Sequence, residues 1–357
     1  MYHFHRIAKA RNVRGVTQTE LAKMINLPHS TLNFIENGKV ELKDDVVFQI
    51  ASALRFPVAY FKKSGSTSRI SKFFYRKRHA LPAKKIVPLE AKIDIMREMY
   101  IEFLDSVDIY FRELPKIPVT ENTSPEDIAK SFRLFLNLDD NPIEKPISLV
   151  EKLGIPIIYF DVDSDKFSGM TIDTDINMPM IVVNCNMSND HIIHTIFHEI
   201  GHLIMHIPFS GDPEFYDKFE DLKSVEKEAD WFSGAFLVPE VTAKYTFNPF
   251  TYSNLTNLKL YWKVSKSSLI MRAKQLKIIA ESKAKTLFIE LSRYGERKKE
   301  KTPISIDYPI LMNRIIEYHK SELGLSYEEI AEEIGGITKS DFIDWFNLPR
   351  KGMISLN

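Results

Sequence analysis

The 357-residue chain is long enough for two or three domains, and its composition, 44% hydrophobic and 27% charged, is that of a globular protein. It has no apolar run of about eighteen residues and has one cysteine, Cys185, which excludes a membrane-spanning protein and a disulfide framework. Residues 1–15 lack the apolar stretch of a secretory signal, so we expect a cytoplasmic protein with no membrane partner.

The formal net charge is zero, but the charges are unevenly distributed. Residues 1–92 carry 18 Lys or Arg and 6 Asp or Glu, a net charge of +12, so the remaining 265 residues have a net charge of −12. Basic segments attract polyanions such as nucleic acids. The distribution therefore predicts an amino-terminal part that binds polyanions, joined to a body that does not.

The first elements in chain order are two short helices joined by a tight turn. Residues 17–25 have the apolar spacing of a helix, with Thr17 as its N-cap and Glu20 at the spacing of a capping box. A second helix is predicted after Pro28, a residue favoured at helix starts, and Gly38 ends it.

Helices continue to about residue 136. Residues 62–85 are predicted to form a basic linker, and residues 89–114 a helix of about seven turns. A helix over 125–136 follows, because Ser124 and Asp127 have the spacing of a capping box.

The middle of the chain changes to short β-rich runs. These runs lie at 155–162, 169–172 and 180–184. Helices are then predicted from about residue 188 and over 224–238, and the tail from 255 has mostly helical patterns. We therefore expect an α+β fold that is mostly helical, with a small β-sheet between helical ends.

The tail contains a repeat of an apolar pattern found near the amino terminus, which we call the echo. Residues 325–346 repeat the apolar spacing of residues 16–35, but residues 321–345 contain seven acidic side chains and one basic one. If this segment is a second helix-turn-helix, we expect it to pack or dimerise rather than to bind DNA.

The segment IFHEIGHLIMH, residues 196–206, contains the motif HExxH. Residues four apart lie on one face of a helix, so His198 and His202 can present imidazole nitrogens to one metal ion. Glu199 is rotated away from His198 and can reach a water molecule on the metal, as a general base requires. The motif indicates a catalytic zinc site.

A third ligand is predicted 24 residues after His202. Catalytic zinc takes three protein ligands and leaves a position open to water, and Glu226 supplies the missing carboxylate. Asp230, one turn later, is suited to accept the spare N–H of a ligand histidine. Glu228 is expected to face elsewhere and is not assigned to the metal.

The alternative is an amphipathic core helix that happens to contain histidines. A burial pattern does not explain two histidines and a glutamate among apolar residues with a matching acidic pair downstream, because buried ionisable groups are costly unless they are paired or bind metal. His194 and His206 extend the four-residue spacing but lack a neighbouring glutamate, so we expect them to be structural or surface residues.

HEIGHLIMH followed by EKEADWFSGAFLVP resembles the ImmA/IrrE family of bacterial zinc metallopeptidases, and GIPIIYF, FSGMTI and PMIVVN resemble the strands before its active-site helix. The resemblance covers roughly residues 120–275. It implies a zincin-like (gluzincin-type) zinc endopeptidase domain, with His198, His202 and Glu226 as ligands and Glu199 as the base. An oxyanion-stabilising residue is also needed, and Tyr245, Tyr252 and Tyr261 remain open as candidates.

TQTELAKMINLPHSTLNFIENGK resembles the Cro/C1-type (XRE-family) helix-turn-helix of bacterial and phage repressors, over residues 5–61. The resemblance implies binding to double-stranded operator DNA, with the second helix in the major groove. Matching positions imply base contacts from His29, Ser30 and Phe34 and phosphate contacts from Gln18, Asn37 and Lys39.

Other features near this segment bear on DNA binding. Arg11 and Glu36 occupy positions that commonly form an internal ion pair in this fold. The basic linker, with Arg76, Lys77, Arg78, Lys84 and Lys85 beside Phe73, Phe74 and Tyr75, could follow a DNA backbone or could be a solvated surface. A protein-interaction module without DNA binding is the alternative, because residues 1–61 carry a net charge of only +3.

The expected domains are a helix-turn-helix domain at 1–61, a basic linker and long helix at 62–119, a zinc peptidase domain at 120–275 and a helical region at 276–357. The leading hypothesis is a bacterial, phage or mobile-element regulator that binds an operator as a homodimer and cleaves a repressor, another regulatory partner or itself. The alternative is a repressor or antitoxin whose zinc domain is a non-proteolytic sensor or docking module. A digestive peptidase fits poorly, because it gives the DNA-binding module no role.

Overall fold

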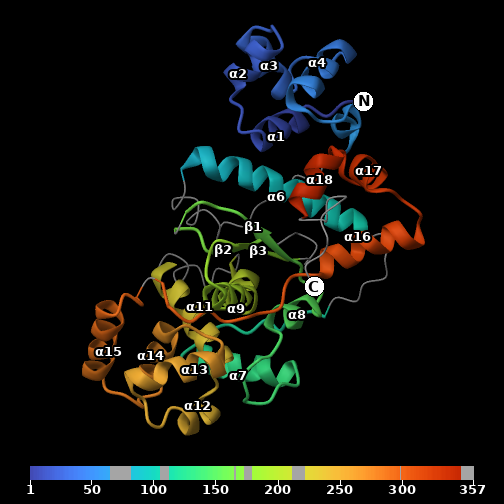
Figure 1. Ribbon diagram of the computed structural model, residues 1–357. Coiled ribbons are helices and arrows are strands. Elements are labelled where there is room, and N and C mark those ends of the chain that lie inside the picture. Colours follow the sequence, from blue (N-terminus) through green and yellow to red (C-terminus); the bar gives the residue numbers. More distant parts are fainter. Residues whose placement is uncertain are drawn as a thin grey trace. The chain divides into compact units, whose positions relative to one another are not determined.

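The computed structural model describes residues 1–64, 82–104, 112–164, 166–172, 179–210, 222–297 and 299–346. The chain forms two compact units, and the described parts of unit 1 are 1–64, 82–104 and 310–346, whereas unit 2 lies within 112–309. The fold is mostly helical with a small sheet (Figure 1), as the sequence predicts.

All secondary-structure elements in the described residues of unit 1 are helices. Its elements are α1 (His5–Val13), α2 (Gln18–Met24), α3 (His29–Glu36), α4 (Asp44–Leu54), the 3-10 helix η1 (Val58–Lys62), α6 (Ala83–Leu104), α16 (Leu311–Glu322), α17 (Tyr327–Glu329), the π-helical η6 (Ile330–Gly335) and α18 (Lys339–Trp345). The Thr17–Glu20 capping box is confirmed at the start of α2. Pro28 occupies the N-cap position of α3, and Gly38 follows the end of this helix with a positive φ of 68°.

The prediction for α6 was wrong at both ends. The helix begins at Ala83, six residues before the predicted start, and residues 112–114 are not helical. Pro88 lies inside the helix, where it removes one backbone hydrogen-bond donor. In a sequence, a proline usually indicates a helix boundary. Buried Ile86 on the first turn shows that packing begins before this proline.

The tail segment of residues 310–346 packs into unit 1. The Arg14 guanidinium donates to both carboxylate oxygens of Asp341 at 2.8 and 2.6 Å and stacks on the Phe56 ring. Lys63 donates to the backbone carbonyl of Ile334. The echo of residues 16–35 therefore forms two short helical segments that pack against the amino-terminal helices.

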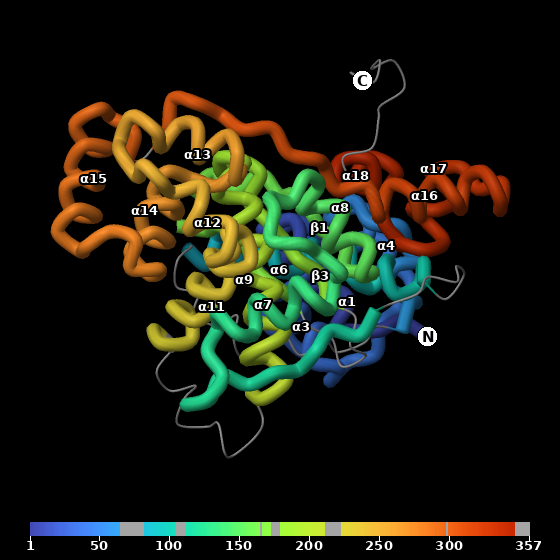
Figure 2. The backbone as a smooth tube through the Cα atoms, turned by 90° about the horizontal axis from the view of Figure 1, so that it is seen from below, coloured from blue at the N-terminus to red at the C-terminus, as the bar shows by residue number. Residues whose placement is uncertain are grey.

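Unit 2 has a three-stranded sheet and helices on either side of it in the sequence. Its elements are α7 (Pro125–Phe135), α8 (Pro146–Glu151), β1 (Ile157–Phe160), β2 (Gly169–Ile172), β3 (Met180–Asn184), α9 (Asn189–Met205), η3 (Ile207–Phe209), α11 (Leu222–Leu237), α12 (Glu240–Thr246), η5 (Tyr252–Asn254), α13 (Leu255–Trp262), α14 (Lys266–Gln275) and α15 (Glu281–Arg293). The helices α12 to α15 gather beside α11 at one end of this unit (Figure 2).

The sheet has the strand order β1-β3-β2, with β1 parallel and β2 antiparallel to β3. Helix α9 packs on this sheet, and β2 approaches it closely at Gly169. A Cβ at Gly169 would lie 2.6 Å from the Cγ2 of Thr195 on α9, so glycine permits this approach. The edge strand β2 is thus held directly against the helix that carries HExxH.

The described residues 295–297 and 299–309 follow α15 and are held by buried charges. Lys259, 2% exposed, donates to Asp190 at the start of α9 and to Glu300. The Asp307 carboxylate accepts the backbone N–H groups of Ile147 and Ser148 at the first turn of α8. This segment therefore ties α9, α13 and α8 together.

Candidate functional site

The site is built on the middle of α9. This helix starts at the N-cap Ser188, four residues after β3, and its apolar residues enter the core of unit 2. His198, Glu199 and His202 are 8%, 3% and 4% exposed. Three ionisable side chains are therefore buried on one helix, which requires partners or a metal.

Helix α11 lies against α9 because the contact residues are small. A Cβ at Gly201, inside the HExxH motif, would lie 3.0 Å from the Cδ1 atom of Phe232 on α11. The Ser233 hydroxyl donates to the backbone carbonyl of His194 at 2.9 Å and links the two helices. The close contact brings the acidic residues of α11 to the histidines of α9.

Three possible ligand atoms converge between these helices. The Nε2 atoms of His198 and His202 are 3.0 Å apart, and the Glu226 carboxylate oxygens lie 3.3 Å from the first and 3.5 Å from the second. Atoms bound tetrahedrally to zinc at about 2.0–2.1 Å lie about 3.3 Å from one another, so the three side chains fit one ion. No other group of three or more His, Cys, Asp or Glu ligands gathers in the described parts of the chain.

The outer nitrogen of His198 has a carboxylate partner. Its Nδ1 lies 2.8 Å from the Asp230 Oδ1, one turn after Glu226 on α11. With Nδ1–H donating to Asp230, the lone pair of Nε2 points toward Glu226 and His202. Asp230 was predicted from the sequence to accept this N–H.

The charge states of the buried groups suit a cation. Burial lowers the pKa of His202 to about 4, so its imidazole is neutral at pH 7. Burial raises the pKa of Glu226, but the adjacent imidazoles of His198 and His202 outweigh this effect and hold the pKa well below its usual value. Two imidazoles beside a carboxylate are a donor set for a divalent ion.

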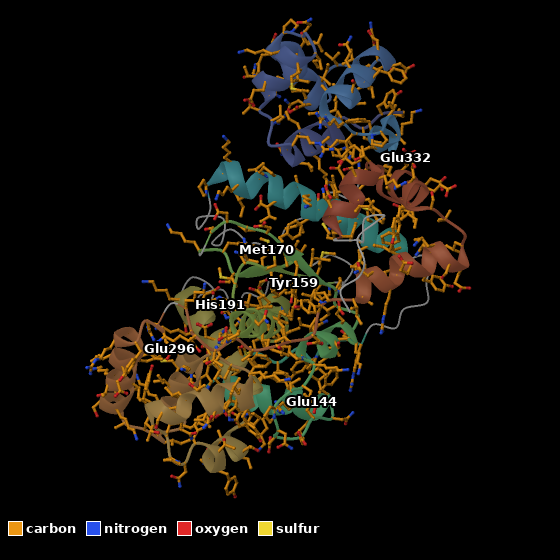
Figure 3. The ribbon with its side chains drawn as sticks, viewed as in Figure 1. Glu144, Tyr159, Met170, His191, Glu296 and Glu332 are labelled. Atoms are coloured by element: carbon orange, nitrogen blue, oxygen red, sulfur yellow. The ribbon has the colours of Figure 1, made fainter. Side chains whose placement is uncertain are left out.

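Glu199 faces the edge strand β2. Its Oε2 accepts the backbone N–H and the hydroxyl of Thr171, both at 3.0 Å, and Thr171 is 1% exposed. Figure 3 marks Met170 on β2 and His191 on α9, the two elements that meet at this site. Sequence reasoning missed Thr171, because only the strand's position over α9 reveals the contact.

A second supporting group was also missed. The Nδ1 atoms of His202 and His206 are 2.9 Å apart, and the His206 Nε2 lies 3.0 Å from the Glu228 Oε2. His206 is 1% exposed, so it is an interior residue. The spacing of four from His202 to His206 was the signal in the sequence that could have found it.

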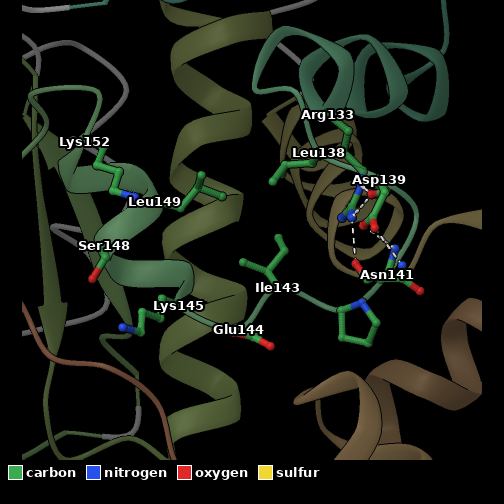
Figure 4. Close-up of a pocket in the computed structure, with 11 residues that line it drawn as sticks. Arg133, Leu138, Asp139, Asn141, Ile143, Glu144, Lys145, Ser148, Leu149 and Lys152 are labelled. Atoms are coloured by element: carbon green, nitrogen blue, oxygen red, sulfur yellow. Dashed lines mark hydrogen bonds between the residues drawn. The ribbon is translucent and has the colours of Figure 1, made fainter.

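The tyrosines considered for an oxyanion role lie on α12, η5 and α13. Tyr245 is 80% exposed, Tyr261 is 44% exposed, and the Tyr252 hydroxyl donates to Glu296 at 2.7 Å. A cavity of about 210 Å³ lies elsewhere in unit 2, along the loop between α7 and α8 (Figure 4). None of the metal-site residues lines this cavity, and its wall residue Arg133 already donates to backbone carbonyls.

The second helix of the predicted helix-turn-helix is α3, and it presents polar and aromatic side chains outward. Among the predicted DNA-contact residues, those that are exposed are His29, Ser30, Phe34, Asn37 and Lys39. The Lys39 ammonium lies 5.8 Å from the centre of the Phe34 ring. Leu32 and Ile35 on the opposite face are buried, so α3 has the amphipathic pattern of a recognition helix.

Gln18 lies in a different environment from the other five. It is half-buried, donates to the Glu36 carboxylate at 3.0 Å and accepts from Asn33. Glu36 also accepts from Arg11 at 2.9 Å, which confirms the predicted internal ion pair. This network joins α1, α2 and α3.

The basic linker was a second predicted DNA-binding feature. Its residues 73–78 lie outside the described residues, and Lys84 and Lys85 are exposed on the first turn of α6. No helix in the described ranges is both long enough and apolar enough to cross a membrane.

Comparison with protein families gives two matches. Residues 7–61 match a helix-turn-helix family, and residues 150–274 match the IrrE N-terminal-like domain of a metallopeptidase family. A comparison with curated proteins gives no match. The second match contains the sheet, α9 and α11, and the first contains most of α1 and all of α2 to α4. The chain therefore combines an XRE-type helix-turn-helix domain with an IrrE N-terminal-like metallopeptidase-family domain that holds a His198–His202–Glu226 cluster.

Proposed function

We propose that the chain is a DNA-binding regulator with a zinc-dependent endopeptidase domain, and that its substrate is a repressor, another regulatory protein or the chain itself. The observation that carries this proposal is the convergence of His198, His202 and Glu226 beside the buried carboxylate of Glu199. A DNA-binding domain in the same chain favours a regulatory substrate over general protein digestion. Such a regulator would act in the cytoplasm, where its operator is.

The proposed ligands of the ion are the Nε2 atoms of His198 and His202 and the carboxylate of Glu226. The set of two imidazoles and one carboxylate is that of catalytic rather than structural zinc sites. When bound, zinc activates a water molecule and polarises a peptide carbonyl.

The protein's own groups handle the protons and hold the geometry. Glu199 is the proposed base, which takes a proton from water and returns it to the leaving amine. Thr171 fixes its carboxylate from β2, and Asp230 fixes the ring of His198 from α11. Each group is supported from an element other than its own, so the site depends on the packing of α9, α11 and β2.

The proposed DNA-binding surface is the exposed face of α3. His29, Ser30 and Phe34 would read base edges in the major groove, and Asn37 and Lys39 would contact phosphates. Gln18 would add a phosphate contact from α2, although its side chain is tied to Glu36. We propose binding as a homodimer to two half-sites about 34–36 Å apart.

The test compares the wild type with Glu199→Gln on a peptide library, with cleavage read by mass spectrometry and zinc content measured on the same samples. We expect both proteins to hold zinc and the variant to cleave about 10²- to 10⁴-fold more slowly, because a general base contributes about that factor. Glutamine can still accept the hydrogen bonds from Thr171, so the fold should persist.

Two results would contradict the proposal. A zinc-loaded wild type that leaves the library and its own chain uncut would favour a sensor or docking role for the metal domain. Equal cleavage by the wild type and Glu199→Gln would remove Glu199 from the mechanism. In either case DNA binding by unit 1 is measured separately, because it depends on other residues.

A further inference from the structure

The two histidines of the metal cluster are supported in different ways. His198 contacts a carboxylate directly, through the 2.8 Å contact between its Nδ1 and Asp230. The Nδ1 of His202 instead faces another imidazole, that of His206, whose Nε2 lies 3.0 Å from the Glu228 carboxylate. Each histidine therefore has a carboxylate on its Nδ1 side. Asp230 lies directly against His198, whereas Glu228 is connected to His202 through His206.

The metal site determines where the protons lie in the series His202, His206 and Glu228. If the Nε2 of His202 offers its lone pair to an ion, the proton of its neutral ring is on Nδ1. This Nδ1–H faces the Nδ1 of His206 at 2.9 Å, so the Nδ1 of His206 must accept. His206 then carries its proton on Nε2 and donates to Glu228 at 3.0 Å.

The burial of these groups makes the arrangement specific. His202 and His206 are 4% and 1% exposed, and the Glu228 side chain is 16% exposed. A reversed tautomer of His206 would place an N–H against the N–H of His202 and a lone pair against a carboxylate. Both contacts would be repulsive in an interior that water cannot relieve.

We propose that His206 and Glu228 are positioning residues that fix the tautomer and orientation of His202, and that Glu228 acts on the metal through His206. This inference rests on the proposed function, since it needs the metal centre. Outer partners of metal-bound histidines generally hold ring orientation and raise ligand basicity. Neither residue contacts substrate in this role.

The test measures zinc affinity of the full chain by competition with a chromogenic chelator, together with the melting temperature of the metal-free protein. His206→Leu removes both ring nitrogens but keeps the bulk, and we expect zinc binding about 10- to 100-fold weaker. Glu228→Gln keeps an acceptor oxygen but removes the charge, so its loss should be smaller. His206→Asn supplies an oxygen near the Nδ1 position and should restore part of the affinity.

The matched control is His194→Leu. His194 precedes His198 by four residues, as His206 follows His202, but its ring centre lies 6.4 Å from that of His198, against 5.0 Å between His202 and His206. We expect its zinc affinity to stay within about two-fold of the wild type, because it holds no ligand nitrogen.

The double variant His206→Leu/Glu228→Gln tests whether Glu228 acts on His202 through His206. If Glu228 acts through His206, the double variant binds zinc no more weakly than His206→Leu alone. Additive losses would show that Glu228 acts independently and would overturn the relay. If His206→Leu does not fold, Glu228→Gln and His206→Asn still decide the matter.

The outcomes separate this inference from the proposed function. A wild type that binds zinc, with variants that bind it equally well and melt at lower temperature, would make the pair merely structural and overturn the inference alone. A wild type that binds no zinc tighter than about 1 mM would contradict the metal centre itself, and the relay with it.

Discussion

Glu296 is a buried carboxylate whose hydrogen bonds favour its charged form. It is 5% exposed and accepts from the Lys266 ammonium at 2.8 Å and the Tyr252 hydroxyl at 2.7 Å. Burial raises the pKa of Glu296, but these hydrogen bonds outweigh it and lower the pKa from 4.5 to about 2. Because the folded protein holds the charged form more strongly than the unfolded chain does, Glu296 stabilises unit 2.

This shift predicts a pH dependence of stability. The contribution of Glu296 is fully present above pH 4.5 and is lost as the pH falls toward about 2. We expect Glu296→Gln to lower the unfolding free energy at pH 7 and to flatten its decline between these two values. Urea unfolding of both proteins at several pH values measures this. Glu281→Gln, at a 61% exposed side chain, is the control, and an equal flattening there would contradict the assignment.

At the scale of single residues, the sequence predicted those contacts that lie on one helix or on helices with regular spacing. His198 and His202 share a face because they are four residues apart, and Glu226 and Asp230 share a face of α11 for the same reason. Thr171 could not be predicted, since its contact with Glu199 depends on how β2 lies over α9. Glu228 was expected to face away, and it does lie outside the donor cluster, but it reaches His206.

The distance between α9 and α11 is set by a glycine. A Cβ at Gly201 would lie 3.0 Å from the Phe232 ring, whereas a Cβ at Gly234 of α11 would have only the end of Gln275 within reach, at 3.8 Å. Replacing glycine by alanine improves the helix propensity by about 1 kcal/mol at either position. The difference in unfolding free energy between the two variants therefore measures the effect of overpacking alone.

We expect Gly201→Ala to be less stable than Gly234→Ala by roughly 1–3 kcal/mol, the usual cost of an extra buried methyl group. Because the added group separates α11 from α9, zinc affinity should fall in Gly201→Ala and remain unchanged in Gly234→Ala. Thermal unfolding and chelator competition measure the two effects. Equal behaviour of the variants would show that the helices relax without loss.

The proposed DNA contacts of α3 lead to a prediction of how DNA binding depends on salt concentration. Removing one phosphate contact lowers the slope of log K against log salt by about one, equally for all DNA sequences. We expect this for Lys39→Ala, whereas His29→Ala should change sequence preference and leave the slope unchanged. Binding titrations at four salt concentrations on a selected operator give both quantities. Lys283→Ala on α15 removes the same charge from the other unit, and a matching slope change there would refute a specific role for Lys39.

The helix positions show where sequence patterns succeed. Capping boxes at Thr17 and Ser124 located the starts of α2 and α7, because the capping side chains and the N–H groups that they satisfy are within three residues. The start of α6 was missed because Pro88 counts against a helix locally, while the burial of Ile86 is a tertiary effect. Local chemistry is readable from the sequence, and packing partners are not.

Unit 1 as a whole depends on residues from both ends of the described chain. Arg14 donates to both oxygens of Asp341 and to the backbone carbonyls of Leu54 and Arg55, so one guanidinium joins α1, α4 and α18. Gly336, at a φ of 59°, lies against Tyr60, where a Cβ would be 3.0 Å from the Cα atom. The helix-turn-helix is therefore packed against the tail segment.

We expect Asp341→Asn to lower the stability of unit 1 by roughly 1.5–3 kcal/mol, the range for hydrogen bonds to charged groups. The control is Glu328→Gln, which removes an exposed ion pair with Lys339 and should cost about 0–1 kcal/mol. Hydrogen exchange of α1 to α4 in the full chain reports the effect on the DNA-binding helices. Unchanged exchange in Asp341→Asn would show that these helices do not need the tail.

A ribosome that adds 5–20 residues per second releases residues 1–64 roughly 10–50 s before residues 310–346, which complete their packing. During that interval Arg14 and Tyr60 lack the partners that α18 and Gly336 provide. The residues synthesised in between include α6 and the whole of the described part of unit 2. A nascent chain thus completes unit 1 only after the whole of unit 2 has been translated, so interrupted translation products would carry α3 on an incomplete scaffold.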